Sequence, residues 1–438
     1  MERFIGIIGI AVLLGIAFLF SSNKKRINPR IIGSALALQF TIALFVFKTK
    51  TGAAALKGMT DGIETILGYS NQGISFVFGD LYNFSGVGFT FALHVLPIII
   101  FVGALMAVLF HLGIMQMVMK VLGFVLRRVI GVNGVEALAA SMNIFVGQDS
   151  APFAVRPYLK DMPRSTLFVI MVTGMATVAG SILAGLYGMG TIDMLNAAGE
   201  PMLGANGEVL KTHLIDMKYL VIASFMAAPG GILMAKMLIP SEEGDADFGP
   251  DNVAIEVTKH SNVIEAAAVG ATEGSKLAII IGAMLIAFIS LIALMNGMLG
   301  GIGEWIYSWS HIGVFHELTM QKILGAIFSP IMFLIGIPSS ETITAGGLFG
   351  EKLILNEFIA FGSYKDMAMA GELSDRAKAI MTIALCGFAN FSSIAIVLGG
   401  AGTLAPERRG ELAAFGLKAV LAASLANLMS AAIVGLLL

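Results

Sequence analysis

A polar stretch inside an apolar chain is the feature that most constrains the fold. Residues 131–159 read GVNGVEALAASMNIFVGQDSAPFAVRPYL and lie between strongly apolar segments. The stretch nevertheless holds two prolines and polar side chains that a lipid-facing span would not tolerate, among them Glu136, Asn143, Gln148, Asp149, Ser150 and Arg156. Broken, polar backbone at membrane depth survives only where protein or a water-filled cavity surrounds it. The stretch is therefore predicted to form a re-entrant hairpin that lines a solute path.

The composition indicates a polytopic membrane protein. Of the 438 residues, 57% are hydrophobic and 13% are charged, about half of the roughly 25% charged residues of a soluble domain. The formal net charge of −2 provides no basic surface for a phosphate backbone, so nucleic acid polymers are excluded as partners. The single cysteine, Cys386, excludes both an internal disulfide framework and a thiolate metal cluster within the chain.

Apolar runs predict an all-α protein of about eight transmembrane helices with two re-entrant hairpins and interfacial helices. The clearest spans are residues 4–20, 31–47, 89–109, 165–187, 219–238 and 277–295. Two amphipathic or aromatic runs, residues 111–128 and 300–319, are predicted to lie at the membrane interface.

Basic residues predict the orientation. The linker after the first span carries Lys24, Lys25, Arg26 and Arg30 without an acidic residue, so the positive-inside rule places it in the cytoplasm. The N-terminus is then outside, and with about eight spans the C-terminus is outside too.

An internal repeat divides the chain. Four residues of the first hairpin recur in a second hairpin 205 positions later (341 − 136 for the glutamates). The pairs are Gly131/Gly336, Glu136/Glu341, Ala140/Ala345 and Phe153/Phe358. A glycine-interrupted span follows each hairpin, as in inverted-repeat transporters. We therefore predict N-terminal scaffold spans (1–110), a first repeat (111–238), a loop with a scaffold span and interfacial helix (239–318) and a second repeat (319–438).

Three motifs resemble one known family. The run FVGQDSAPFAVRPYL from Phe145 resembles the GQTEAP…RPYL signature of concentrative nucleoside transporters, LNEFIAF from Leu355 resembles their NEF motif, and LCGFANFSSIAI from Leu385 resembles their GFAN motif. The order of the motifs and the hydropathy along nearly the whole chain agree with that family. The resemblance implies a bacterial member, a homotrimer in the cytoplasmic (inner) membrane, which imports nucleosides by alternating access.

The resemblance also implies a substrate site. Gln148, with Asp149 and Ser150, occupies the positions that hold the base, and Glu357, Asn390 and Ser393 occupy those that hold the ribose, with Phe388 against the base. A carboxylate and an amide suit the vicinal hydroxyls of an uncharged nucleoside, which agrees with these roles. The family has Thr-Glu where this chain has Asp149-Ser150. Since one helical residue turns about 100°, Asp149 cannot simply replace the missing glutamate, and base preference is left open.

For the coupling ion, the resemblance implies a sodium site formed by Asn143, Val146, Thr177 and Val178. Carbonyl, amide and hydroxyl oxygens suit a hard monovalent cation. Sodium is the leading interpretation and a proton the alternative. No cofactor is expected.

Two other classes of protein fit the sequence less well. A membrane enzyme would need a nucleophile with its base or a metal cluster, yet the six histidines are scattered without metal-ligand spacing: His94, His111, His213, His260, His311 and His316. A channel for small neutral solutes would instead need a filter or charged ring and no coupling site; downhill flux without sodium dependence would favour it.

Overall fold

The computed structural model describes residues 2–79, 81, 90–148, 151–194, 202, 211–245, 248–249 and 260–438. These residues are mostly helical, which confirms the predicted all-α class. The strands among them are β1 (Thr191–Asp193) and β2 (Lys211–His213), an antiparallel pair in which Thr191 lies opposite His213.

The helices of the first half follow the predicted order. Before the first hairpin come α1 (Glu2–Leu19), α2 (Pro29–Lys48), α3 (Lys50–Phe78), α5 (Phe91–His94), α6 (Leu96–His111) and α7 (Ile114–Ile130). The hairpin and the elements after it are α8 (Gly134–Asn143), α9 (Ala151–Ala154), α10 (Arg164–Ala176), α11 (Gly180–Met189) and α12 (Met217–Leu238). The predicted break in the span after the hairpin therefore falls between Ala176 and Gly180.

The second half repeats this arrangement after one long helix. Its helices are α13 (Val263–Ser310), α14 (Met320–Leu334), α15 (Thr342–Ile354), α16 (Glu357–Met369), α17 (Asp375–Leu385), α18 (Ser392–Leu404) and α19 (Arg409–Leu437). The pair α15–α16 is the second hairpin, and α17–α18 is the second broken span. The short apolar helix α14 was not predicted.

Six helical segments among the described residues are long and apolar enough to cross a membrane: α2, α5–α6, α10–α11, α12, α13 and a segment of residues 406–437 that contains α19. Shorter apolar helices, residues 5–19 and 392–404, correspond to two further predicted spans. Buried residues make up 94% of the most apolar window in α12 and 89% in α10–α11, but only 17% in α2 and in α5–α6. The core therefore lies around α10, α12 and α19, and α2 and α6 form its periphery.

Helix α13 corrects the predicted boundary near residue 295. The sequence suggested a span over 277–295 and then a separate interfacial segment, but one helix of 48 residues runs through the span and into that segment as far as Ser310. The glycine pair Gly300–Gly301 does not end the helix; the reversal comes at His311, whose φ is +51°. At 1.5 Å per residue the helix is about 72 Å long, more than twice the roughly 30 Å hydrocarbon thickness.

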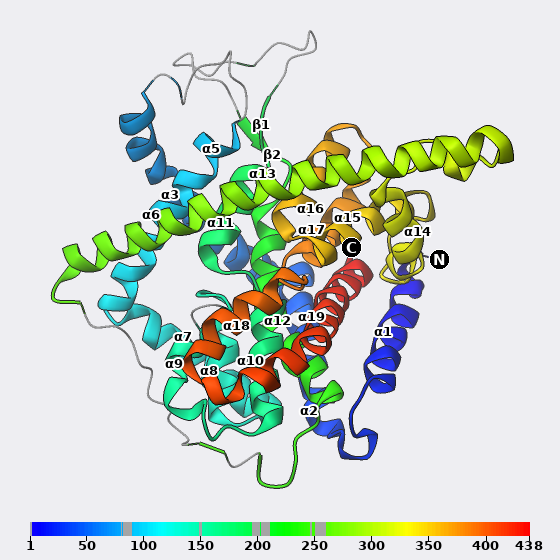
Figure 1. Ribbon diagram of the computed structural model, residues 1–438. Coiled ribbons are helices and arrows are strands. Elements are labelled where there is room, and N and C mark those ends of the chain that lie inside the picture. The colour runs from blue at the N-terminus through cyan, green and yellow to red at the C-terminus, as the bar shows by residue number, and fades with distance from the viewer. Residues whose placement is uncertain are drawn as a thin grey trace.

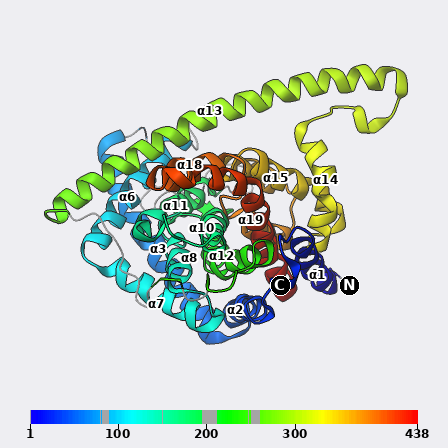
Figure 2. The ribbon, with the colours of Figure 1, turned by 60° about the horizontal axis from the view of Figure 1, so that its bottom comes forward.

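Helix α13 also sets the outline of the molecule. It crosses the molecule in Figure 1 and lies along one edge of the remaining helices in Figure 2, and in both views its C-terminal end extends past them before the chain returns to α14. The two chain ends lie close together, where α1 packs against α19. Helix α13 runs along the other side of α19 (Figure 2).

Close helix packing in the core depends on glycine. A Cβ at Gly230 of α12 would lie 2.4 Å from Nε2 of Gln39, a buried α2 side chain. That nitrogen donates to the Met226 carbonyl at 3.0 Å and to the Ser430 hydroxyl at 3.1 Å. One polar side chain thus joins α2, α12 and α19 inside the membrane protein, as interhelical hydrogen bonds commonly do.

Candidate functional site

The second hairpin presents a carboxylate at its tip. Helix α16 starts where the side chain of Asn356 accepts a hydrogen bond from the Ile359 amide at 3.0 Å, an N-cap. Glu357 is the first residue of that helix and is only 3% exposed. The unpaired amides at a helix N-terminus favour negative charge, so the cap and the helix together support a buried carboxylate here.

The second broken span supplies the partners of that carboxylate. Nδ2 of Asn390 donates to Oε2 of Glu357 at 3.0 Å. The side-chain Oδ1 of Asn390 accepts from the Ser392 hydroxyl at 2.7 Å, and from the Ser393 amide and hydroxyl at 3.0 and 3.1 Å. Asn390 is thereby fixed at the break between α17 and α18, with its amide aimed at the second hairpin.

The first hairpin adds a side chain to this set of hydrogen-bonded residues. Its helix α8 is capped by Asn133, and its turn passes through Gly147, whose φ of +89° favours glycine. The next residue, Gln148, is 3% exposed, and its Nε2 donates to the Ser393 hydroxyl at 2.9 Å. Asp149 and Ser150 lie outside the described residues.

These contacts form one polar chain across both repeats. Gln148 donates to Ser393, Ser393 donates to Asn390, and Asn390 donates to Glu357. Within the described residues, Oε1 of Gln148 is buried without a hydrogen-bond partner. A buried acceptor left unpaired costs about 1 to 3 kcal/mol, so this oxygen is available to a ligand that brings a donor.

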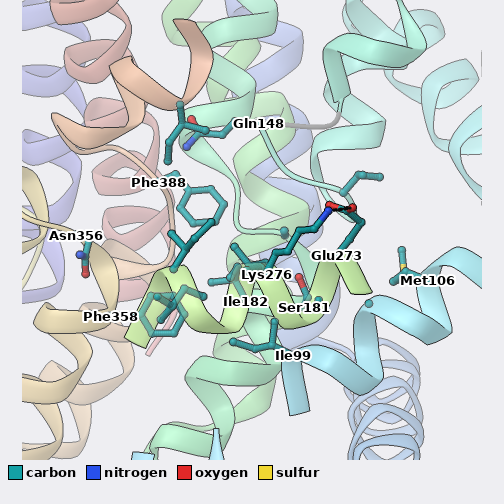
Figure 3. A pocket seen from close by; sticks show the side chains of 18 of the residues that line it. Ile99, Met106, Gln148, Ser181, Ile182, Glu273, Lys276, Asn356, Phe358 and Phe388 are labelled. Carbon is teal, nitrogen blue, oxygen red and sulfur yellow. Dashed lines mark hydrogen bonds and ion pairs between the residues drawn. The ribbon is translucent and has the colours of Figure 1, made fainter. Parts of the chain in front are cut away.

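A cavity of about 900 Å³ opens onto these hydrogen-bonded side chains (Figure 3). Its lining includes the polar residues Gln148, Asn356, Glu357, Asn390 and Ser393, and the aromatic side chains of Phe145, Phe358 and Phe388. The opposite wall is made by α6, with Ile99 and Met106, and by α13, with Glu273 and Lys276 (Figure 3). The cavity therefore has a polar end between the hairpins and, on α6 and α13, a mostly apolar wall that carries the Glu273–Lys276 ion pair.

Two buried side chains hold the broken spans together. Nζ of Lys352, on α15, donates to the Ala384 carbonyl and to Oδ1 of Asn427, both at 2.8 Å. Nδ2 of Asn427, on α19, donates to the carbonyls of Ala176 at 2.7 Å and Cys386 at 3.3 Å. These carbonyls belong to the ends of α10 and α17, where intrahelical donors run out. Lys352 and Asn427 thus supply hydrogen-bond donors to the backbone carbonyls at both breaks.

The two breaks also touch directly. The Phe388 amide donates to the Thr177 carbonyl at 3.3 Å. A Cβ at Gly387 would lie 2.7 Å from the Ala176 carbonyl oxygen and 2.4 Å from Oδ1 of Asn427, so this position requires glycine. The inverted repeat therefore places its two interruptions back to back, beside the polar chain.

The residues predicted to bind sodium lie next to the first break. Nδ2 of Asn143 donates to the Thr173 hydroxyl at 3.1 Å, and Oδ1 of Asn143 is a buried oxygen with no partner in the described part of the chain. The Thr177 hydroxyl donates to the Thr173 carbonyl at 2.9 Å. Val178 is fully buried, whereas Val146 lies on the cavity lining. No cluster of three or more His, Cys, Asp or Glu side chains suited to a metal occurs among the described residues.

The glutamates of the sequence repeat anchor the bases of the hairpins. Glu136 is 1% exposed and accepts from Nζ of Lys236 at 2.6 Å and from the Thr166 hydroxyl at 2.7 Å. Its counterpart Glu341 accepts from the Ser374 amide and hydroxyl, both at 3.0 Å. Neither lines the cavity.

Five of the residues predicted to bind the nucleoside line the cavity, as does Val146 of the predicted sodium site, and other residues were missed. Gln148, Glu357, Phe388, Asn390 and Ser393 all line it. Four residues carry no spacing signal and were missed: the N-cap Asn356, Ser392, and the pair Lys352 and Asn427. A charged lysine within the apolar run GLFGEKLILNEF was nevertheless a detectable anomaly, because intramembrane charges are usually paired or functional.

Comparison with family models assigns nearly the whole chain. Residues 8–81 match the Na+ dependent nucleoside transporter N-terminus, residues 92–192 match a nucleoside recognition Gate model, and residues 219–435 match the Na+ dependent nucleoside transporter C-terminus. Among solved structures, CNTnw in an inward-facing substrate-bound state is 42% identical, with a TM-score of 0.87, over 100% of this chain and 98% of that one. A variant of CNTnw in an outward-facing state gives the same TM-score at 41% identity.

Curated relatives agree with these matches. An uncharacterized transporter of Haemophilus influenzae is 46% identical over 98% of this chain and 96% of its own length. The nucleoside permease NupC of Helicobacter pylori is 39% identical over 98% of this chain and 96% of its own length. The mouse sodium/nucleoside cotransporter 1 is 33% identical over 100% of this chain and 64% of its own length. The chain therefore belongs to the Na+ dependent (concentrative) nucleoside transporter family, a family of multi-pass membrane transporters rather than enzymes.

Proposed function

We propose that this protein imports nucleosides across the cytoplasmic membrane by secondary active transport, with the substrate between the two hairpins and the two broken spans. The observation that carries the proposal is the convergence of Gln148, Glu357, Asn390 and Ser393, from two repeats, on one cavity. Relatives solved in inward- and outward-facing states support alternating access as the mechanism.

The chemistry of the cavity favours an uncharged ligand with a diol. A carboxylate accepts hydrogen bonds from two hydroxyls, and the Asn390 amide beside it can donate to either. The free Oε1 of Gln148 can accept from a base N–H. The cation on the cavity wall, Lys276, is already paired with Glu273 at 2.8 Å. A phosphorylated ligand would need an unpaired cation instead.

We propose sodium as the coupling ion, held by Asn143, Val146, Thr177 and Val178. The buried, unpartnered Oδ1 of Asn143 beside the first break supports this set, because a desolvated oxygen in a carbonyl-rich break is a ready ligand for a hard cation. A proton remains the alternative ion, with Asp149 as its carrier.

Replacing Asn143 or Thr177 by Ala is expected to raise the sodium concentration for half-maximal uptake about ten- to a hundredfold, the equivalent of one lost charge-assisted contact of about 1.5 to 3 kcal/mol. The stabilisation of the folded protein by sodium should weaken in parallel. Uptake and melting temperature, each titrated with sodium, measure both effects. Ser424→Ala, which removes another buried hydroxyl, should change neither. If sodium affects neither uptake nor melting of the parent protein, the coupling ion is a proton.

Asp149 and Ser150 are proposed to set base preference. A carboxylate beside Gln148 would accept from amine or imino edges of a base and repel carbonyl edges. The double change Asp149→Thr with Ser150→Glu restores the family motif and is expected to change the rank order of a nucleoside panel competing with labelled uridine and adenosine. An unchanged rank order would show that Asp149 does not read the base.

We further propose that both chain ends lie outside the cell and that the protein is a homotrimer. The basic linker around Lys24–Arg26 supports the orientation. An exposed apolar face of α13, which includes Ile279, Ile286, Leu294 and Trp305, supports contact with lipid or with other copies of the chain. Cysteine accessibility from either side of the membrane and native mass measurement would test the two points.

A further inference from the structure

Glu351, on α15, is a buried carboxylate that the proposed substrate site does not use. It is 1% exposed, and its Oε1 accepts one hydrogen bond, from Nε2 of Gln321 on α14, at 2.7 Å. Its Oε2 is buried and has no hydrogen-bond partner within the described ranges, although the Ser363 hydroxyl of α16 lies beside the carboxyl. The chain therefore buries a carboxyl that has one well-formed hydrogen bond, from Gln321, and only the Ser363 hydroxyl beside its second oxygen.

No cation of the described residues compensates this carboxyl. On its own helix, Lys352 points instead to Ala384 and Asn427. The charged groups of the elements packed around it are engaged elsewhere: Lys322 of α14 with the His316 carbonyl, Lys365 of α16 with the Thr191 carbonyl, Lys378 of α17 with Asp375, Arg376 of α17 with the Gly336 and Gly435 carbonyls, and Glu304 of α13 with His316. Tyr364 of α16 donates to the Lys378 carbonyl. The acids of α16 are Glu357, which accepts from Asn390, and the exposed Asp366.

The packing around Glu351 leaves little room for water. A Cβ at Gly350 would lie 2.5 Å from Cβ of Leu324, and one at Gly347 would lie 3.0 Å from the Gln321 carbonyl oxygen. Helices α14 and α15 therefore approach backbone to backbone at this level. Burying a lone carboxylate in such a setting costs far more free energy than burying the neutral acid, which favours a bound proton.

Glu351 is also the start of a polar connection to α13. Oε1 of Gln321 accepts from Nδ2 of Asn296 at 3.0 Å, and Oδ1 of Asn296 accepts from the Met320 amide at 2.8 Å. On the other side, the Glu351 carbonyl accepts from the amide of Leu355, the residue that precedes Asn356 and Glu357. Glu351 thus links the tip of the second hairpin to α14 and, through two amides, to α13.

We propose that Glu351 is a proton-binding site whose occupancy controls how firmly the second hairpin is held against α14 and α13. With the proton bound, the neutral acid stays in its apolar setting and keeps its bond to Gln321. Release of the proton to the aqueous phase leaves a charge that the setting cannot compensate, and the hairpin loosens. The site is separate from the residues proposed to bind sodium, and its link to uptake rests on the proposed transport function.

Glu351→Gln tests the proposal, since an amide imitates the neutral acid without titrating. Because the folded protein would bind a proton here that the unfolded chain releases above about pH 4.3, its stability should fall as pH rises. The melting temperature of the parent protein should therefore fall more steeply with rising pH, from about pH 4.3 upward, than that of Glu351→Gln. The infrared carbonyl band of a protonated carboxyl should be present in the parent and lost in the variant. Glu372→Gln, which changes an exposed carboxyl after α16, should match the parent in both measurements.

Two results would overturn the proposal: the same carbonyl band in the parent and in Glu351→Gln, or the same pH dependence of melting. If Glu351→Gln does not fold, Gln321→Leu should shift the band by removing the donor to Oε1, and an unshifted band would count against the site. In liposomes, Glu351→Gln should flatten the fall of uptake with rising pH. Failure of even the parent to transport nucleosides would contradict the proposed function, while the infrared and melting results would still decide on the proton site.

Discussion

Glu357→Gln is expected to lower nucleoside uptake by about ten- to a hundredfold or more. The carboxylate has four acceptor positions, of which Oε2 already takes the Asn390 amide at 3.0 Å. An amide in its place turns one acceptor into a donor and cannot accept from both ribose hydroxyls. A hydrogen bond to a charged group contributes about 1.5 to 3 kcal/mol, and initial rates of labelled uridine uptake into proteoliposomes would measure its loss.

The matched control for this variant is Glu273→Gln. Glu273 also lines the cavity, but on α13, with a largely exposed side chain paired to Lys276. Exposed ion pairs contribute little, so uptake by this variant should stay near that of the parent. A free nucleobase should compete weakly, because it lacks the diol. Parental uptake by Glu357→Gln would contradict the assignment of Glu357 to the ribose.

Lys352→Met is expected to lower stability by about 2 to 6 kcal/mol, because the Ala384 carbonyl and Oδ1 of Asn427 would each lose a donor at about 1 to 3 kcal/mol per buried group. The loss should spread to both breaks, since Asn427 also holds the Ala176 and Cys386 carbonyls. Thermal unfolding in detergent would measure the loss.

Lys378→Met provides the comparison. Lys378 lies on α17 and pairs with the exposed Asp375 at 3.3 Å, so its removal should change stability by less than about 0.5 kcal/mol. Equal melting temperatures for Lys352→Met and the parent would show that the junction does not stabilise the breaks. A variant that melts normally but transports poorly would assign Lys352 to positioning the site alone.

Local patterns were enough to predict much of this architecture. Polar residues in apolar runs predicted the hairpin at 131–159, and the glycine-rich interruptions predicted the breaks that the structure has at 177–179 and 386–391. The motifs around Gln148, Glu357 and Asn390 predicted three residues that line one cavity. Each of these signals comes from a few neighbouring residues, where the cost of exposing polar groups to lipid is directly visible in sequence.

Contacts between distant segments were beyond such patterns. Gln148 and Ser393 are 245 residues apart, and Lys352 and Asn427 are 75 apart, so nothing in their local sequence announces the pairing. The continuity of α13 was missed for a different reason: the Trp, Tyr and His residues after position 300 suggested a separate interfacial segment. The glycines there do not interrupt the helix, because glycine inside a membrane helix is tolerated where it packs closely. Gly303 does so, against the Phe315 carbonyl and Leu318.

Accumulation of labelled uridine and adenosine in proteoliposomes, with the sodium and pH gradients imposed separately, tests the central claim most directly. The account predicts that nucleoside rises inside above its external concentration when sodium is higher outside, and that the accumulation collapses when the gradient is removed. Glu357→Gln should lower the initial rate of accumulation about ten- to a hundredfold. Nucleoside that only equilibrates across the membrane, whichever gradient is imposed, would contradict the account and identify a downhill pathway instead.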